Sequence, residues 1–183
     1  MTDPKGPTQK FISKIDQLKP KDLNTSNVDE LIGYINEDGF DPNFKDNFEY
    51  SLILTIFYRE VLRRENSETS KISNYQDKIK LAFLAHPDLD LNKQYIDGLH
   101  CLTILDHLLT NQEEPYQPNF KKVGDIKLLL EFSDKIDDGR LIQKARDLIR
   151  EYNSSHKNNT DCLMRSRAED DYVDAYVDWL MRQ

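Results

Sequence analysis

Three neighbouring residues, His100, Cys101 and His107, carry the side chains in this sequence that are best suited to catalysis or metal binding. A thiolate beside an imidazole is a nucleophile, and both groups are also zinc ligands. In a helix, however, Cys101 would point about 100° away from His100, so the two would not face each other. Metal sites also need three or four ligands with supporting partners. We therefore expect a structural role for all three residues, and we predict neither a metal nor a cofactor.

A second group of reactive side chains is the carboxylate-rich stretch "RAEDDYVDAYVDWL" near the end of the chain. On a helix its aspartates share one side: Asp170, Asp171, Asp174 and Asp178. Tyr172, Val173, Tyr176, Val177 and Leu180 lie largely on the other side. The carboxylates could bind Ca²⁺, but the fixed glycine of an EF-hand loop is absent. The simpler interpretation is a solvated face over an apolar capping stripe. The alternative is a helix that offers Tyr176 and Trp179 to a partner.

The remaining sequence contains few signs of an enzyme. "YREVLRRE" brings Arg59, Arg63 and Arg64 close to two glutamates, which is typical of a solvent-facing salt-bridge surface, although it could also meet an acidic partner. A glycine-rich phosphate loop, a G-x-S-x-G elbow and an H-E-x-x-H motif are all missing from the sequence. We therefore predict that the protein is not an enzyme.

The composition restricts the partners that the chain could bind. The 183 residues carry 25 Lys and Arg against 33 Asp and Glu, for a net charge of −8, with 38% hydrophobic and 32% charged residues. Nucleic acid and anionic lipid both require a basic face, so we expect neither as a partner. We find neither an apolar run of about 20 residues nor the apolar core of a secretory signal. Two cysteines outside any C-x-x-C motif indicate a reducing compartment, and we predict a cytoplasmic protein.

The apolar spacing predicts about eight helices that must position these side chains, and no strand or hairpin. A strand over "SLILTIFY" is possible, but the helix formers in the following "REVLRRE" favour a long helix. A second helix should begin after Ser26 or Asn27 and stop at Gly39. The predicted domains are a flexible arm at 1–8, a helical domain at 9–152, a polar linker at 153–161 and a C-terminal amphipathic helix within 162–183. The predicted helices cover 9–19, 27–38, 50–66, 75–85, 97–112, 123–132, 138–152 and 168–182.

One kind of break between helices recurs along the chain. It is written "YINEDGFDPNFKDNFEYSLI", then "FLAHPDLDLNKQYIDGLHCLTI", and more faintly "DIKLLLEFSDKIDDGRLIQKA". Each stretch has a helix end, a short break with an Asp-x-Asn or Ile-Asp pair, and a new apolar run. Asn43 and Asn92 are equivalent, at an offset of 92 − 43 = 49, and Asn92 to Asp137 is 137 − 92 = 45. Asn and Asp suit such turns because their side chains bond to nearby backbone amides.

This pattern resembles the ankyrin repeat over about residues 27 to 150. The first copy matches the family at Glu37, Gly39, Asp41, Asn43 and Asp46, with Ser51 in place of Thr. The second matches at Asp90, Leu91, Asn92 and Gly98, and the third at Leu128, Leu129, Leu130, Glu131, Ile136 and Asp137. The T-P-L-H motif is replaced by "SLIL" and "HCLT", and the spacings exceed the usual period of about 33 residues. The excess falls in polar loops at 65–74 and 111–122, where insertions cost little closure entropy. The alternative is an irregular helical bundle whose Asp-Asn-Gly loops merely look alike.

The resemblance implies an all-α fold, a short ankyrin-like helical repeat array (solenoid) with capping helices (9–19 and 168–182) at both ends. It also implies a non-catalytic, monomeric module that binds another protein through finger loops and inner helices. The expected partner-binding residues are Phe44, Lys45, Phe48, Tyr50, Lys93, Tyr95 and Ile96. The chain also resembles short ankyrin effectors of intracellular bacteria, which would place it in a host cytosol. The alternatives are a helical enzyme or enzyme regulator, and an acidic inhibitor that mimics nucleic acid, against which the mixed lysines argue.

Overall fold

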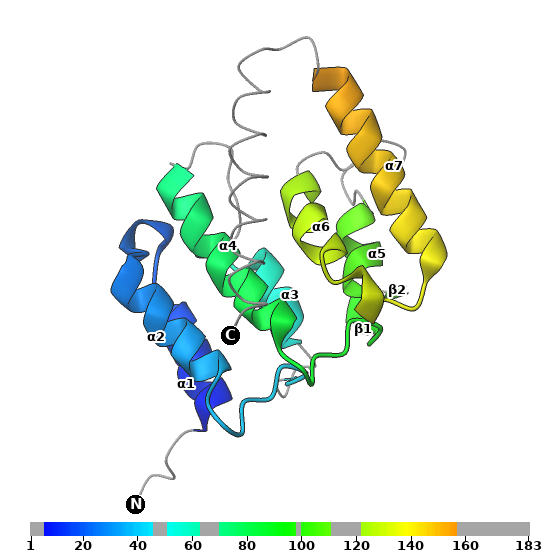
Figure 1. Ribbon diagram of the computed structural model, residues 1–183. Coiled ribbons are helices and arrows are strands. Elements are labelled where there is room, and N and C mark those ends of the chain that lie inside the picture. Colours follow the sequence, from blue (N-terminus) through cyan, green and yellow to red (C-terminus); the bar gives the residue numbers. More distant parts are fainter. Residues whose placement is uncertain (1–5, 46–50, 63–69, 98–99, 111–121, 157–183) are drawn as a thin grey trace, which may run out of the picture. The chain divides into compact units, whose positions relative to one another are not determined.

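The computed structural model describes residues 6–45, 51–62, 70–97, 100–110 and 122–156, and its chain divides into two compact units, residues 1–104 and 105–183 (Figure 1). The protein is mostly helical, as predicted. Within the described ranges, we find no helix with the length and apolarity that crossing a bilayer would require. The elements of the first unit are α1 (Pro7–Gln17), η1 (Pro20–Asp22), α2 (Thr25–Ile35), α3 (Leu52–Tyr58), α4 (Ser70–Ala85), β1 (Tyr95–Asp97) and β2 (His100–Leu102).

Helices α1 and α2 form a hairpin whose ends follow from local chemistry. Pro7 occupies the first turn of α1, where its missing N–H costs nothing. The side chain of Asn24 caps α2 by accepting a 3.1 Å hydrogen bond from the Asn27 backbone amide, so the cap lies two or three residues before the predicted Ser26 or Asn27. Helix α2 ends at Ile35 rather than at Gly39, because residues 36–39 form a separate turn in which Gly39 has φ +84°.

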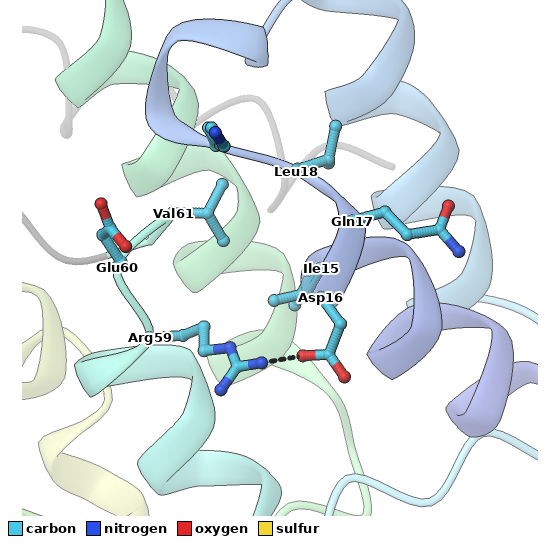
Figure 2. Close-up of a pocket in the computed structure, with 8 residues that line it drawn as sticks. Ile15, Asp16, Gln17, Leu18, Arg59, Glu60 and Val61 are labelled. Carbon is cyan, nitrogen blue, oxygen red and sulfur yellow. Dashed lines mark hydrogen bonds and ion pairs between the residues drawn. The ribbon is translucent and has the colours of Figure 1, made fainter.

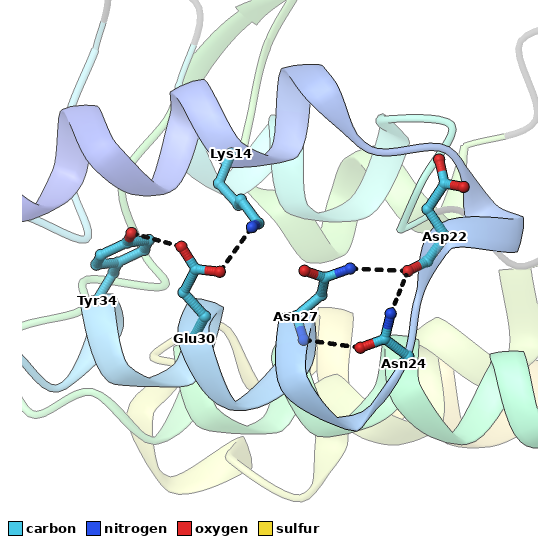
Figure 3. A network of polar contacts seen from close by, with 6 residues as sticks. All are labelled: Lys14, Asp22, Asn24, Asn27, Glu30 and Tyr34. Atoms are coloured by element: carbon cyan, nitrogen blue, oxygen red, sulfur yellow. Dashed lines mark hydrogen bonds and ion pairs between the residues drawn. The ribbon is translucent and has the colours of Figure 1, made fainter.

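A polar network holds α1 against α2 (Figure 3). The Glu30 carboxylate accepts hydrogen bonds from the Lys14 ammonium at 2.6 Å and from the Tyr34 hydroxyl at 2.7 Å. These bonds, that of Lys14 first, lower the pKa of Glu30, and the bond to Glu30 raises the pKa of Tyr34. At the other end of the hairpin, the Asp22 carbonyl accepts from the side-chain amides of Asn24 and Asn27, which fixes the entry into α2.

Helix α2 also lies beside α4 and packs against it (Figure 1). Phe40, in the loop after α2, packs against side chains of α1 and α4. The ring of Phe40 makes edge-on contacts with Phe11 at 5.7 Å and with Phe83 at 6.4 Å between centroids, and it also touches His86. Phe11 and Phe83 are fully buried, and Phe40 is 6% exposed. The loop after α2 therefore contributes a core residue that joins the first helix of the unit to the fourth.

Helix α3 is shorter than the sequence predicted. Ser51 caps it by accepting a 3.2 Å bond from the Ile53 amide, and it ends at Tyr58, where Arg59 becomes extended at ψ 135°. The bend carries Val61 and Leu62 into the core, at 2% and 0% exposure. The side-chain amide of Gln76 in α4 donates to the Val61 carbonyl at 3.3 Å. Burial of these two residues overrides the helix propensity of "REVL", so the predicted continuous helix is wrong at Arg59.

The segment after α4 contains a hairpin that the sequence analysis did not predict. Strands β1 and β2 pair antiparallel, with Tyr95 opposite Leu102 and Asp97 opposite His100. The expected helix over 97–112 is therefore wrong in its first half, and only α5 (Ile104–Leu109) is helical there. An earlier segment makes a similar but smaller connection, an isolated antiparallel bridge between Lys45 and Ser51. Both connections follow an Asp-x-Asn turn.

The second unit is built from helices that the sequence largely predicted. It contains most of α5, α6 (Val123–Leu130), η3 (Ser133–Lys135) and α7 (Gly139–His156), and α6 packs against α7. Its core includes four fully buried residues: Leu108, Ile126, Leu129 and Ala145. Asp138 caps α7 by accepting from the amides of Arg140 at 2.9 Å and Leu141 at 3.3 Å. The predicted C-terminal helix at 168–182 lies outside the described residues, and α7 extends to His156, into the predicted linker.

Candidate functional site

The recurring Asp-x-Asn stretches both form the same local turn in the first unit. The Asn43 amide donates to the Asp41 side chain at 2.9 Å, and the Asn92 amide donates to the Asp90 side chain at 2.9 Å. These turns are an offset of 90 − 41 = 49 residues apart, the spacing found in the sequence. The third, fainter stretch differs, since Asp138 there caps α7 directly. Two of the three stretches therefore form the same hydrogen-bonded turn, whereas the third uses an aspartate to cap a helix.

Asn43 joins the first turn to the second. Its side-chain amide donates to the Asp88 carbonyl at 2.6 Å, and its side-chain oxygen accepts from the Asp90 amide at 3.0 Å. Its own carbonyl accepts from the Lys93 ammonium at 3.2 Å. One asparagine thus uses its backbone amide and carbonyl and both ends of its side chain to hold together two loops that are more than forty residues apart in sequence.

We name the exposed and half-exposed residues at this junction the corner surface. It consists of Asp41, Asn43, Phe44, Lys45, Asp88, Asp90 and Lys93. Phe44, Lys45 and Lys93 are half-buried, whereas the three aspartates are exposed. We find no ion pair of these three carboxylates with any other described residue. The corner surface therefore combines an aromatic residue with three carboxylates and two ammonium groups, a net charge of 2 − 3 = −1.

Tyr95 lies beneath this surface. It is only 3% exposed, and the Lys45 ammonium lies 6.0 Å from the centre of its ring. Burial raises the pKa of the Tyr95 hydroxyl, a hydrogen bond with Ser51 opposes this shift, and the nearby charge of Asp90 adds to it. The phenol therefore stays neutral, and a buried phenol with a hydrogen-bond partner is an ordinary core arrangement. Tyr95 is therefore a buried residue under the corner surface, whereas the sequence analysis expected it among the partner-binding residues.

The other predicted site residues divide into two sets. Phe44, Lys45 and Lys93 lie at the junction of the two turns, and their role in partner binding stays a prediction. Phe48 and Tyr50 lie outside the described residues, and so does the side chain of Ile96, whose backbone belongs to β1. The sequence analysis did not predict that Asp41, Asp88 and Asp90 would edge the site. These three aspartates belong to the turns or lie next to them in the sequence, and this closeness could have predicted that they lie at the edge of the site.

A separate cavity of about 230 Å³ lies in the first unit, between the end of α1 and the end of α3 (Figure 2). Its walls combine the apolar side chains of Ile15, Leu18 and Val61 with an ion pair between Asp16 and Arg59. Gln17, Lys19 and Glu60 complete the lining, in which two positive side chains balance two negative ones. None of the predicted site residues lines it. Across the described part of the chain, we find no cluster of three His, Cys, Asp or Glu side chains able to hold a metal ion.

Comparisons with known proteins found no match, so the functional proposal rests on the geometry of the described residues. No protein-family model matches the chain. No curated protein and no solved structure matches it either.

Proposed function

We propose that this protein is a non-catalytic interaction module, built as a short ankyrin-like helical array, that binds another protein through its corner surface. Support comes first from the order of the elements. Helices α1 and α2 pack together, and α2 also packs on α4 of the consecutive helices α3 and α4. A polar connection follows each of α1–α2, α3–α4 and α5–α6 before the next helix. A helix pair cannot bury its own apolar stripe, so such pairs are stable when they stack on neighbours.

The hydrogen bonds of Asn43 are the single observation that carries the proposal. They connect the turn after the first helix pair to the corresponding turn after the second, at Asp88 and Asp90. An irregular bundle with similar loops by coincidence has no reason to place equivalent turns side by side. The contact therefore favours a repeated arrangement, in which successive loops form one continuous edge.

The chemistry of that edge favours a protein partner. Phe44 is a half-buried aromatic residue that offers an apolar anchor, and aromatic residues are enriched at protein interfaces. The surrounding aspartates repel nucleic acid and anionic lipid, and they complement basic side chains on a partner. Charges at the rim of an interface mainly raise the association rate and select the partner.

The proposal is tested by affinity capture with the full-length chain and quantitative mass spectrometry. We compare the unmodified protein with Phe44→Ala and Asp88→Lys, because neither substitution removes a side-chain hydrogen bond of the turn. Asp29→Lys, on the exposed face of α2, makes the same charge change away from the corner surface. Captured partners are then measured by titration, where loss of the Phe44 anchor should weaken binding about tenfold, or 1.4 kcal/mol.

The result expected is selective loss in the two corner variants, with binding by Asp29→Lys retained. Equal binding by all four proteins would overturn the proposal, and so would loss of binding only in Asp29→Lys. Circular dichroism of each variant separates loss of binding from loss of folding.

A further inference from the structure

Helix α7 has an apolar stripe that is wider than the described elements cover. Ala145, at the middle of the helix, is fully buried. Its apolar neighbours on the same face are all half-exposed: Leu141, Ile142, Leu148, Ile149 and Tyr152. At 100° per residue, these six side chains span an arc of about 120° centred on Ala145. Helix α6 packs against α7, yet both margins of the stripe remain partly open.

The margins of this stripe are basic. Lys144 and Arg146 lie about 100° to either side of Ala145, and both are exposed. We find neither of them in an ion pair with another described residue. Over 139–156 the helix carries four Lys or Arg and two Asp or Glu, a net charge of 4 − 2 = +2, whereas the whole chain carries −8. The open face of α7 therefore suits an occupant that is apolar in its centre and acidic at its edges.

One segment of this same chain has that chemistry. After His156 the chain continues for 183 − 156 = 27 residues, and its stretch 168–182, "AEDDYVDAYVDWLMR", contains five Asp or Glu and one Arg, a net charge of 1 − 5 = −4. Its apolar residues recur at helical spacing: Tyr172, Val173, Tyr176, Val177, Trp179 and Leu180. As a helix this stretch would be about 22 Å long, against about 27 Å for α7, and the intervening residues 157–167 are enough to reverse the chain direction.

We propose that residues 168–182 cover the half-exposed stripe of α7, as its antiparallel partner helix, with carboxylates facing Lys144 and Arg146. The order of elements supports this, because α7 is the last described helix and packs on α6, so no later described helix is available to cover its remaining stripe. In this arrangement the acidic residues 168–182 contact α7 of the same chain, so they are not free to bind another protein. It does not depend on the function of the corner surface.

Trp179 is the only tryptophan in the chain and reports directly on this contact. We measure its emission spectrum and its quenching by acrylamide in the full-length protein. Leu148→Asp places a charge within the stripe, and the double variant Lys144→Glu, Arg146→Glu reverses both margins. Arg140→Glu, on the far side of α7, is the matched control. Because Lys144 and Arg146 are exposed, the double variant keeps the test independent of any folding defect in Leu148→Asp.

The expected result is a shielded Trp179 in the unmodified protein and in Arg140→Glu. Both stripe variants should shift its emission to longer wavelength and increase its quenching. Strong quenching already in the unmodified protein would overturn the proposal, and so would a shielded Trp179 that neither variant affects. A shielding that disappears on dilution, together with a fall in mass by light scattering, would assign the stripe to a second copy of the chain and would also overturn it.

Discussion

At the scale of single residues, Asn43 and Glu30 hold together parts of the first unit that are distant in sequence. Asn43 links two loops, and Glu30 links α1 to α2 through Lys14. Their environments differ, since Asn43 bonds to backbone groups whereas Glu30 depends on charge. The two residues should therefore respond to different perturbations.

Replacing Asn43 with alanine should destabilise the protein. The substitution removes the two hydrogen bonds that the Asn43 side chain makes with the Asp88 carbonyl and the Asp90 amide, and each such bond contributes about 0.5–1.5 kcal/mol net. Urea unfolding followed by circular dichroism measures the change. Asn36→Ala, at the exposed end of α2, removes an equivalent amide and should change the free energy of unfolding by less than about 0.5 kcal/mol. Equal effects of the two substitutions would contradict the role of Asn43.

Glu30 should make the stability of the first unit depend on pH. Its pKa in the folded protein is lowered from the ordinary value of 4.5, so the folded state favours the charged carboxylate. That contribution is fully present above 4.5 and is lost as the pH falls through the lowered pKa. The unmodified protein should therefore lose more stability over this acidic range than Glu30→Gln does. Thermal unfolding in a series of acidic buffers measures the difference, with Asp29→Asn as the exposed control; parallel curves for all three proteins would argue against the effect.

At the scale of elements, the sequence predicted most helices but not the places where tertiary burial overrides local pattern. Helices α1, α2, α4, α6 and α7 follow from apolar spacing and capping residues. The end of α3 does not, because "YREVLRRE" is itself a good helical sequence and only the burial of Val61 and Leu62 explains the bend. The β1–β2 hairpin could have been predicted from the sequence. Gly98 follows Asp97 between two short apolar stretches, which is a common hairpin pattern.

The site was predictable to a similar degree. Alignment of the repeated stretches predicted the two equivalent turns, at Asp41 with Asn43 and at Asp90 with Asn92. Partner binding by Phe44, Lys45 and Lys93 stays a prediction. Burial of Tyr95 could not be predicted, since one residue of a strand faces the core and the next faces away, and no strand was expected. The hydrogen bonds between the loops also depend on spacing in three dimensions, which the sequence does not contain.

The turn between α2 and Phe40 offers a comparison of two glycines. Gly39 has φ +84°, a conformation that costs other residues about 1–2 kcal/mol, whereas Gly33 lies inside α2. A Cβ at either position meets no atom within 4 Å, so packing does not separate them. Gly39→Ala should therefore lower the melting temperature, and Gly33→Ala should raise it, because alanine favours a helix by about 0.5–1 kcal/mol. Shifts of the same sign in differential scanning calorimetry would contradict this account.

At the scale of the whole molecule, the net charge gives the clearest expectation about the kind of partner that the protein binds. A net charge of −8 opposes association with polyanions, and the described elements show exposed aspartates at the turns of the first unit. The C-terminal segment adds carboxylates, which the proposed contact with α7 would partly neutralise. The molecule should accordingly favour basic over acidic partners.

We expect the full-length chain to bind neither duplex DNA nor vesicles containing phosphatidylserine at physiological salt. Fluorescence anisotropy with labelled DNA and vesicle sedimentation measure this directly. A basic protein such as a histone-derived domain serves as the positive control in both assays. Saturable binding by this protein that weakens as salt is raised would contradict the expectation, because it would reveal a basic face that outweighs the net charge.

The bonds of Asn43 have a consequence for kinetics. Because one side chain fixes both loops before any ligand arrives, a binder that spans them would lose little conformational entropy on association. Recognition would then resemble the docking of rigid bodies, with modest rearrangement and a rate set mainly by diffusion and charge. Removing these hydrogen bonds would slow association with a partner, even if every atom that contacts the partner is kept.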